Sequence, residues 1–153
     1  MGGMTTASDV ARGVSRLLIQ EGFSPILEFS LANGRRLDIA ALGPDGTVVG
    51  VEIKVAVPDL KADDKWPHYL EFCELFYFAI PPEFPDELVP SGTGLIVADR
   101  YGGAIVRAAK PAILHASRRK AVTLRFAKVA AERLALALDL SVEPRNLLGS
   151  AAE

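Results

Sequence analysis

Three consecutive pieces of the chain decide the fold: RLDIAAL at residues 36–42, GPDG at 43–46 and TVVGVEIKVAV at 47–57. The middle piece predicts a tight turn, because Pro44 pre-sets φ and Gly46 accepts a positive φ. The third piece alternates apolar with small or charged residues, which indicates a strand with two different faces. We therefore expect an antiparallel pair of strands joined by this turn.

The turn also limits the register of the pair. Opposed residue numbers should sum to about 89 or 90, depending on whether the loop takes an extra residue. With a sum of 90, Asp38 lies opposite Glu52, and Lys54 shares their face. With a slip of one residue, Asp38 moves to the other face. The sequence leaves both registers open, although Gly46 makes the longer loop feasible.

An Asp, a Glu and a Lys on one face could perform metal-dependent chemistry. Two carboxylates at such a short distance repel each other unless a cation neutralises them. Mg²⁺ is held by one or two carboxylates together with water and phosphate oxygens, and a lysine beside it can stabilise charge on a phosphate. The alternative is an ordinary surface pair of Glu52 and Lys54, worth at most ~1 kcal/mol, with Asp38 nearby by chance.

The remaining chain alternates between helices and strands. Ser8 or Asp9 can cap the first helix, and Pro67 predicts a kink or break in the second. An apolar stripe is expected on the last helix at Leu124, Ala127, Ala131, Leu134 and Leu138. Helices are predicted over about 8–21, 60–73 and 117–138, and strands over about 26–31, 36–42, 47–57, 75–80, 94–98 and 103–107. The order α-β-β-β-α-β-β-β-α predicts an α/β or α+β domain with a mixed sheet flanked by helices.

Composition indicates one globular domain over residues 1–153, with an ordered core at about 8–138 and a loose tail around Pro144. Cys73 is the single cysteine, so no disulfide framework is expected and a cytoplasmic location fits. We expect no membrane association, because no apolar run reaches the ~18 residues that a spanning helix needs. The motifs of P-loop nucleotide binding, zinc proteases, dinucleotide binding and serine hydrolases are missing.

Basic residues gather near the end of the chain despite a net charge of −2. Between residues 110 and 133 there are seven basic residues and one acidic residue. Such a local basic face can bind phosphates whatever the net charge. Arg118, Arg119 and Lys120 are thus either DNA contacts or a solvated helix start, and the sequence does not choose between these interpretations.

Several motifs together resemble the PD-(D/E)XK nuclease superfamily and, within it, the MmcB-like DNA-repair branch. The resemblance covers about residues 8–138. It is carried by EFSLANGRRLD at 28–38, VEIK at 51–54, Lys65-Trp66-Pro67 with Tyr69, FYFA at 76–79 and GLIVAD at 94–99.

The resemblance implies a restriction-endonuclease-like core and a Mg²⁺- or Mn²⁺-dependent site that hydrolyses phosphodiester bonds of DNA. It implies that Asp38 and Glu52 are metal ligands, that Lys54 is the catalytic lysine, and that Lys65 and Tyr69 support the site or contact DNA. Lys65 stands where relatives often carry Gln, and Leu37 stands where the motif has Pro. The alternative is a module of the same fold that binds DNA or a DNA-repair protein with little or no cleavage.

Glu28 is a candidate for a third metal ligand. A strict two-residue turn at Asn33-Gly34 pairs Phe29 with Asp38 and turns Glu28 away. A three-residue loop with Gly34 in the left-handed region pairs Glu28 with Asp38 instead. Both loops remain open on the sequence alone.

Overall fold

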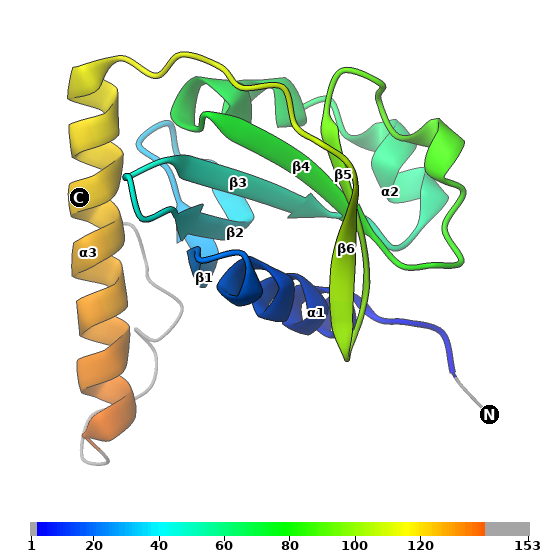
Figure 1. Ribbon diagram of the computed structural model, residues 1–153, viewed down its shortest axis with the longest axis horizontal. Helices are drawn as coiled ribbons and strands as arrows, with labels where there is room; N and C mark the ends of the chain where they lie inside the picture. The colour runs from blue at the N-terminus through cyan, green and yellow to red at the C-terminus, as the bar shows by residue number, and fades with distance from the viewer. Residues whose placement is uncertain (1–2, 140–153) are drawn as a thin grey trace.

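The structure is a computed structural model that describes residues 3–139; the tail predicted around Pro144 lies outside this range. Its centre is a mixed six-stranded sheet whose spatial order, β1-β2-β3-β4-β5-β6, follows the chain (Figure 1). The strands β1 to β3 and the pair β5–β6 are antiparallel, whereas β3–β4 and β4–β5 are parallel. The strands are β1 Ser24–Ser30, β2 Arg36–Leu42, β3 Val48–Ile53, β4 Leu75–Ile80, β5 Gly94–Asp99 and β6 Gly102–Arg107. The predicted order of helices and strands is confirmed, and so is the mixed sheet.

The register of β2 and β3 is the longer-loop alternative. Ile39 pairs with Val51 and Leu42 with Val48, so opposed residue numbers sum to 90. Gly46 has φ of 86° and donates its N–H to the Gly43 carbonyl, which closes the turn. Position 38 therefore lies opposite position 52.

Strand β3 is shorter than predicted. The expectation that it extends to Val57 is wrong, because β3 ends at Ile53 and Val57 already begins helix α2, Val57–Ala62. Pro58 occupies the first turn of that helix, where its missing N–H costs nothing. The Lys54 N–H still bonds to the Ala79 carbonyl of β4, so Lys54 stays attached to the sheet.

The predicted helix over 60–73 is divided, as Pro67 indicated. Helix α2 ends at Ala62, and a 3-10 helix, η1, covers Trp66–Phe72. A second 3-10 helix, η2 at Asp86–Leu88, lies in the loop between β4 and β5. The turn between α2 and η1 therefore comes just before Lys65, beside the end of β3.

Helix α1, Ala7–Gln20, covers one face of the sheet. Its cap is Thr6, not Ser8 or Asp9 as expected. Thr6 and Asp9 form a reciprocal capping box, in which each side chain accepts a backbone N–H of the other residue. Gly13 lets this helix lie directly on the β5–β6 turn, since a Cβ there would be 1.9 Å from the Asp99 carbonyl oxygen.

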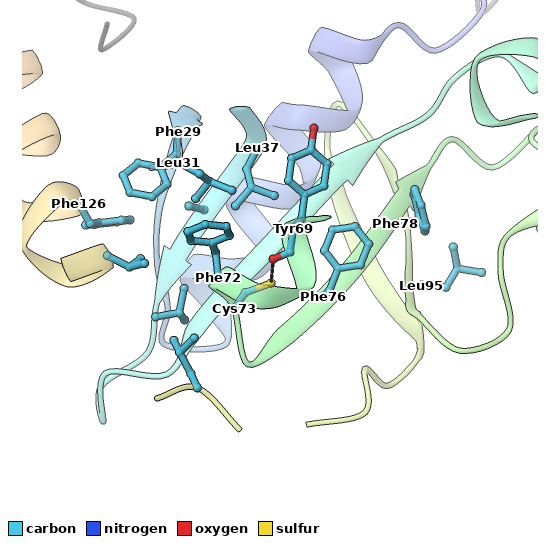
Figure 2. Close-up of a cluster of buried hydrophobic side chains, with 14 of the residues drawn as sticks. Phe29, Leu31, Leu37, Tyr69, Phe72, Cys73, Phe76, Phe78, Leu95 and Phe126 are labelled. Atoms are coloured by element: carbon cyan, nitrogen blue, oxygen red, sulfur yellow. Dashed lines mark hydrogen bonds between the residues drawn. The ribbon is translucent and has the colours of Figure 1, made fainter. Parts of the chain in front are cut away.

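The other face of the sheet is covered by η1 and by helix α3, Ala116–Leu138. Figure 2 shows this apolar cluster, in which the rings of Phe29 and Phe126 pack 5.8 Å apart. Trp66 packs against Phe76 and Phe78 in this cluster. Cys73 is buried in the same cluster.

The prediction of which face of the last helix is buried is wrong. Leu124, Leu134 and Leu138 are 56%, 61% and 76% exposed. The buried residues of α3 are instead Val122, Phe126 and Val129. The helix carries two apolar stripes, and periodicity alone does not say which of them meets the sheet. Among residues 3–139, no helix combines the length and hydrophobicity that crossing a membrane requires.

Candidate active site

Asp38 and Glu52 converge where β2 and β3 separate. The regular ladder ends at the pair Ile39 and Val51. Beyond it, the Asp38 N–H donates to Glu52 Oε1 at 3.1 Å, and the Ile53 N–H donates to Asp38 Oδ2 at 2.7 Å. Each carboxylate therefore caps the opposite strand, and the two side chains are held against each other by the backbone.

This position is electrostatically costly for both acids. Glu52 is only 6% exposed, and burial, followed by the neighbouring Asp38 carboxylate, raises the pKa of Glu52 to about 8. Burial also raises the pKa of Asp38, although the N–H of Ile53 and the charge of Lys54 oppose the rise. A buried and a half-buried carboxylate that resist ionising together form a site whose electrostatic cost a divalent cation would lower.

Lys54 lies near this pair but bonds elsewhere. Its ammonium Nζ is 2.8 Å from Oδ2 of Asp63, and the two side chains are 13% and 7% exposed. Asp63 was missed in the sequence, where it looks like one of several acids in a polar segment. Its Oδ1 accepts the N–H groups of Lys65 and Trp66. Burial opposes ionisation of Asp63, but the bond from Lys54 and these backbone donors outweigh it and lower its pKa.

These side chains line one open hollow of about 520 Å³, beside the ends of β2 and β3 and the start of η1. Tyr69 is buried against the sheet, with its hydroxyl at the edge of the apolar cluster (Figure 2). The hydroxyl donates to the Arg36 carbonyl at 3.2 Å, and burial, with the nearby carboxylates, raises the Tyr69 pKa to about 12. Lys65 is exposed at the rim. The predicted residues in the hollow are Asp38, Glu52, Lys54, Lys65 and Tyr69, joined by Arg36, Asp59 and Asp63.

Glu28 takes a different position from these residues. Opposed residues of β1 and β2 sum to 66, and Gly34 has φ of 84°, so the longer loop places Glu28 opposite Asp38. Glu28 itself has φ of 51°, which interrupts the pairing at that point. Its carboxylate lies 3.8 Å from the Arg36 guanidinium, and it lines a separate hollow that Asp38 also borders. Its role as a metal ligand stays a prediction.

The basic residues at the start of α3 do not line this hollow. The Arg118 guanidinium lies over the Phe72 ring, 4.4 Å from its centroid. Arg119 bonds to Glu74 and to the Gly46 carbonyl, which fixes α3 to the β2–β3 turn. Lys120 is exposed. Structural contacts thus account for two of the three, and a DNA-binding role for this group remains a prediction.

The carboxylate oxygens of Asp38 and Glu52 suit a hard cation that keeps part of its water shell. Within residues 3–139, no group of three or more His, Cys, Asp or Glu side chains is placed to hold a metal. Two carboxylate oxygens from Asp38 and Glu52 are what Mg²⁺ commonly takes from a protein when water and phosphate supply the rest. The residues present therefore fit Mg²⁺ or Mn²⁺ and do not fit a closed structural zinc site.

A mixed sheet with an Asp, a Glu and a Lys beside the separating ends of an antiparallel pair defines the PD-(D/E)XK nuclease-like class. Within it, the sequence profile of the MmcB-like DNA repair proteins matches residues 2–141, and the chain belongs to that family. A similar solved structure is the SPO1766 protein of unknown function from Silicibacter pomeroyi. It is 41% identical, with a TM-score of 0.86, and the match covers 90% of this chain and 94% of that one. A search of the curated proteins found no match.

Proposed function

We propose that this member of a DNA-repair family is a metal-dependent nuclease that hydrolyses phosphodiester bonds of DNA. The observation that carries the proposal is the mutual capping of Asp38 and Glu52, which fixes a half-buried and a buried carboxylate side by side. Such a pair stabilises the fold poorly while it is unoccupied by a cation. Its cost is explained if the pair serves to bind Mg²⁺ or Mn²⁺.

Four residues of the hollow have a task in this proposal. Asp38 and Glu52 would hold the ion, which when bound would polarise a phosphodiester and activate water for attack. Lys54 supplies a positive charge that stabilises the charge developing on the phosphate. Lys65, exposed at the rim, is placed to contact the DNA backbone.

A cleavage assay tests the proposal. Purified protein is incubated with single-stranded, duplex and branched DNA in Mg²⁺, Mn²⁺ or EDTA, beside Glu52→Gln and Lys54→Met. Matched controls are Glu71→Gln and Lys61→Met, which change the same residue types at exposed positions outside the hollow. We expect metal-dependent cutting that falls at least ~100-fold in the two site variants and is retained in the controls.

A second candidate function is DNA binding without cleavage. It is favoured by the ion pair of Lys54 with Asp63, which occupies the ammonium in the structure described here. Binding to DNA that is unchanged by EDTA, by Glu52→Gln and by Lys54→Met, together with no cutting of any substrate, would establish this alternative and exclude the nuclease.

A further inference from the structure

Lys54 is paired with Asp63 and not with the two acids beside it. Its ammonium lies 2.8 Å from the Asp63 carboxylate. Among residues 3–139, no other acidic group comes within 4.0 Å of it. Yet Glu52 is only two residues before it in the chain, and the charge of Lys54 acts on both Asp38 and Glu52. Some feature of the structure must keep the lysine from these carboxylates.

Asp63 is built as a fixed acceptor for that lysine. Its Oδ1 accepts the N–H of Lys65 at 2.8 Å and the N–H of Trp66 at 3.1 Å, which immobilises the carboxylate in the turn after α2. The Trp66 ring anchors this turn, because it stacks on the Phe76 ring in the apolar cluster, with the two ring centroids 6.1 Å apart. The other oxygen, Oδ2, is left for Lys54.

Without Asp63, the flexible lysine side chain would turn toward the negative pair of Asp38 and Glu52. A Lys ammonium is a compact charge on a stem with four rotatable bonds, so it moves easily to the nearest desolvated carboxylate. An ammonium placed between Asp38 and Glu52 would neutralise the charge that attracts a divalent ion. It would then compete with the ion for the same oxygens.

We propose that Asp63 is a positioning residue that holds the Lys54 ammonium away from Asp38 and Glu52 and so keeps these carboxylates open to a divalent cation. This inference rests on the cation site of the proposed function, but not on cleavage. Asp63 touches neither the ion nor DNA in this role and acts through Lys54.

A double-mutant cycle on Mn²⁺ affinity tests the proposal. The four proteins are the wild type, Asp63→Asn, Lys54→Met and the double variant, titrated with Mn²⁺ by isothermal calorimetry. Asn at position 63 keeps an oxygen for the two backbone N–H groups, so the turn is retained. We expect Asp63→Asn to weaken Mn²⁺ binding about tenfold with Lys54 present, and less than about twofold in the Lys54→Met background.

Asp59→Asn is the matched control, because Asp59 lines the same hollow but does not bond to Lys54. It removes the same charge and should change the affinity less than about twofold. Urea denaturation of each variant confirms folding.

Two results would overturn the proposal. The first is equal weakening by Asp63→Asn with and without Lys54, which would mean that Asp63 acts by its charge alone or as a ligand. The second is no weakening at all, including a wild type that binds no Mn²⁺. A protein that shows the expected cycle but cuts no DNA would refute the nuclease and leave this role of Asp63 intact.

Discussion

Replacing Glu52 by Gln should stabilise the metal-free protein, and more so at high pH. In the folded chain, burial and the Asp38 carboxylate raise the Glu52 pKa from 4.5 to about 8. Between these two values the folded state keeps a proton that the unfolded state has lost. Stability therefore falls as pH rises through this window, and the full penalty remains above it.

The magnitude follows from the same shift. Each pKa unit corresponds to ~1.36 kcal/mol, so the raised pKa of Glu52 destabilises the folded protein by at most about 5 kcal/mol at high pH. Gln carries no charge at any pH and retains an oxygen that can accept the Asp38 N–H, so the hydrogen bond of the cap survives. The stability advantage of Glu52→Gln over the wild type should thus grow by several kcal/mol, at most about 5, between about pH 5 and pH 9.

Urea denaturation in EDTA, followed by circular dichroism at several pH values, measures this difference. Glu71→Gln is the control, because Glu71 is exposed and its variant should track the wild type. A difference between Glu52→Gln and the wild type that stays constant to within about 1 kcal/mol across the range would refute the reasoning. It would mean that Glu52 is not held in a costly, desolvated position next to Asp38.

Three further variants test the packing that positions the site. Gly13→Ala should cost about 3 kcal/mol, because its Cβ would lie 1.9 Å from the Asp99 carbonyl oxygen, and a stability equal to wild type in urea would show that the helix can move away. Thr6→Ala should cost about 1 kcal/mol by removing the acceptor of the Asp9 N–H, and an unchanged melting temperature would contradict the capping box. Tyr69→Phe should lower the free energy of unfolding by about 1 kcal/mol, because it removes the hydrogen bond from the hydroxyl to the Arg36 carbonyl of β2. An unchanged midpoint of urea denaturation would show that this bond contributes nothing to stability.

The parts of the fold that depend on local chemistry were predictable. Turn residues narrowed the β2–β3 register to sums of 89 or 90, and the structure shows Gly46 at positive φ with the sum of 90, which sets Asp38 against Glu52. Pro67 correctly indicated the break between α2 and η1. In both cases the signal is local, because Gly46 accepts a positive φ that other residues avoid, and Pro67 fixes its own φ and lacks an N–H.

The parts that depend on distant contacts were not predictable. Asp63 reaches Lys54 only because the turn after α2 returns beside the end of β3, and no spacing rule carries that information. The kink at Glu28, with φ of 51°, is unusual for a residue with a side chain. Arg133 of α3 donates to the Leu27 and Glu28 carbonyls at this kink, and more than a hundred residues separate the partners in the sequence.

The central claim is that Asp38 and Glu52 together bind one divalent cation, and diffraction from Mn²⁺-soaked crystals tests it most directly. An anomalous difference map collected near the manganese edge should show a peak in direct contact with oxygens of both carboxylates. The peak should be absent from crystals of Glu52→Gln treated in the same way. A saturating soak that leaves these oxygens without a peak, or that places manganese only elsewhere, would contradict the account.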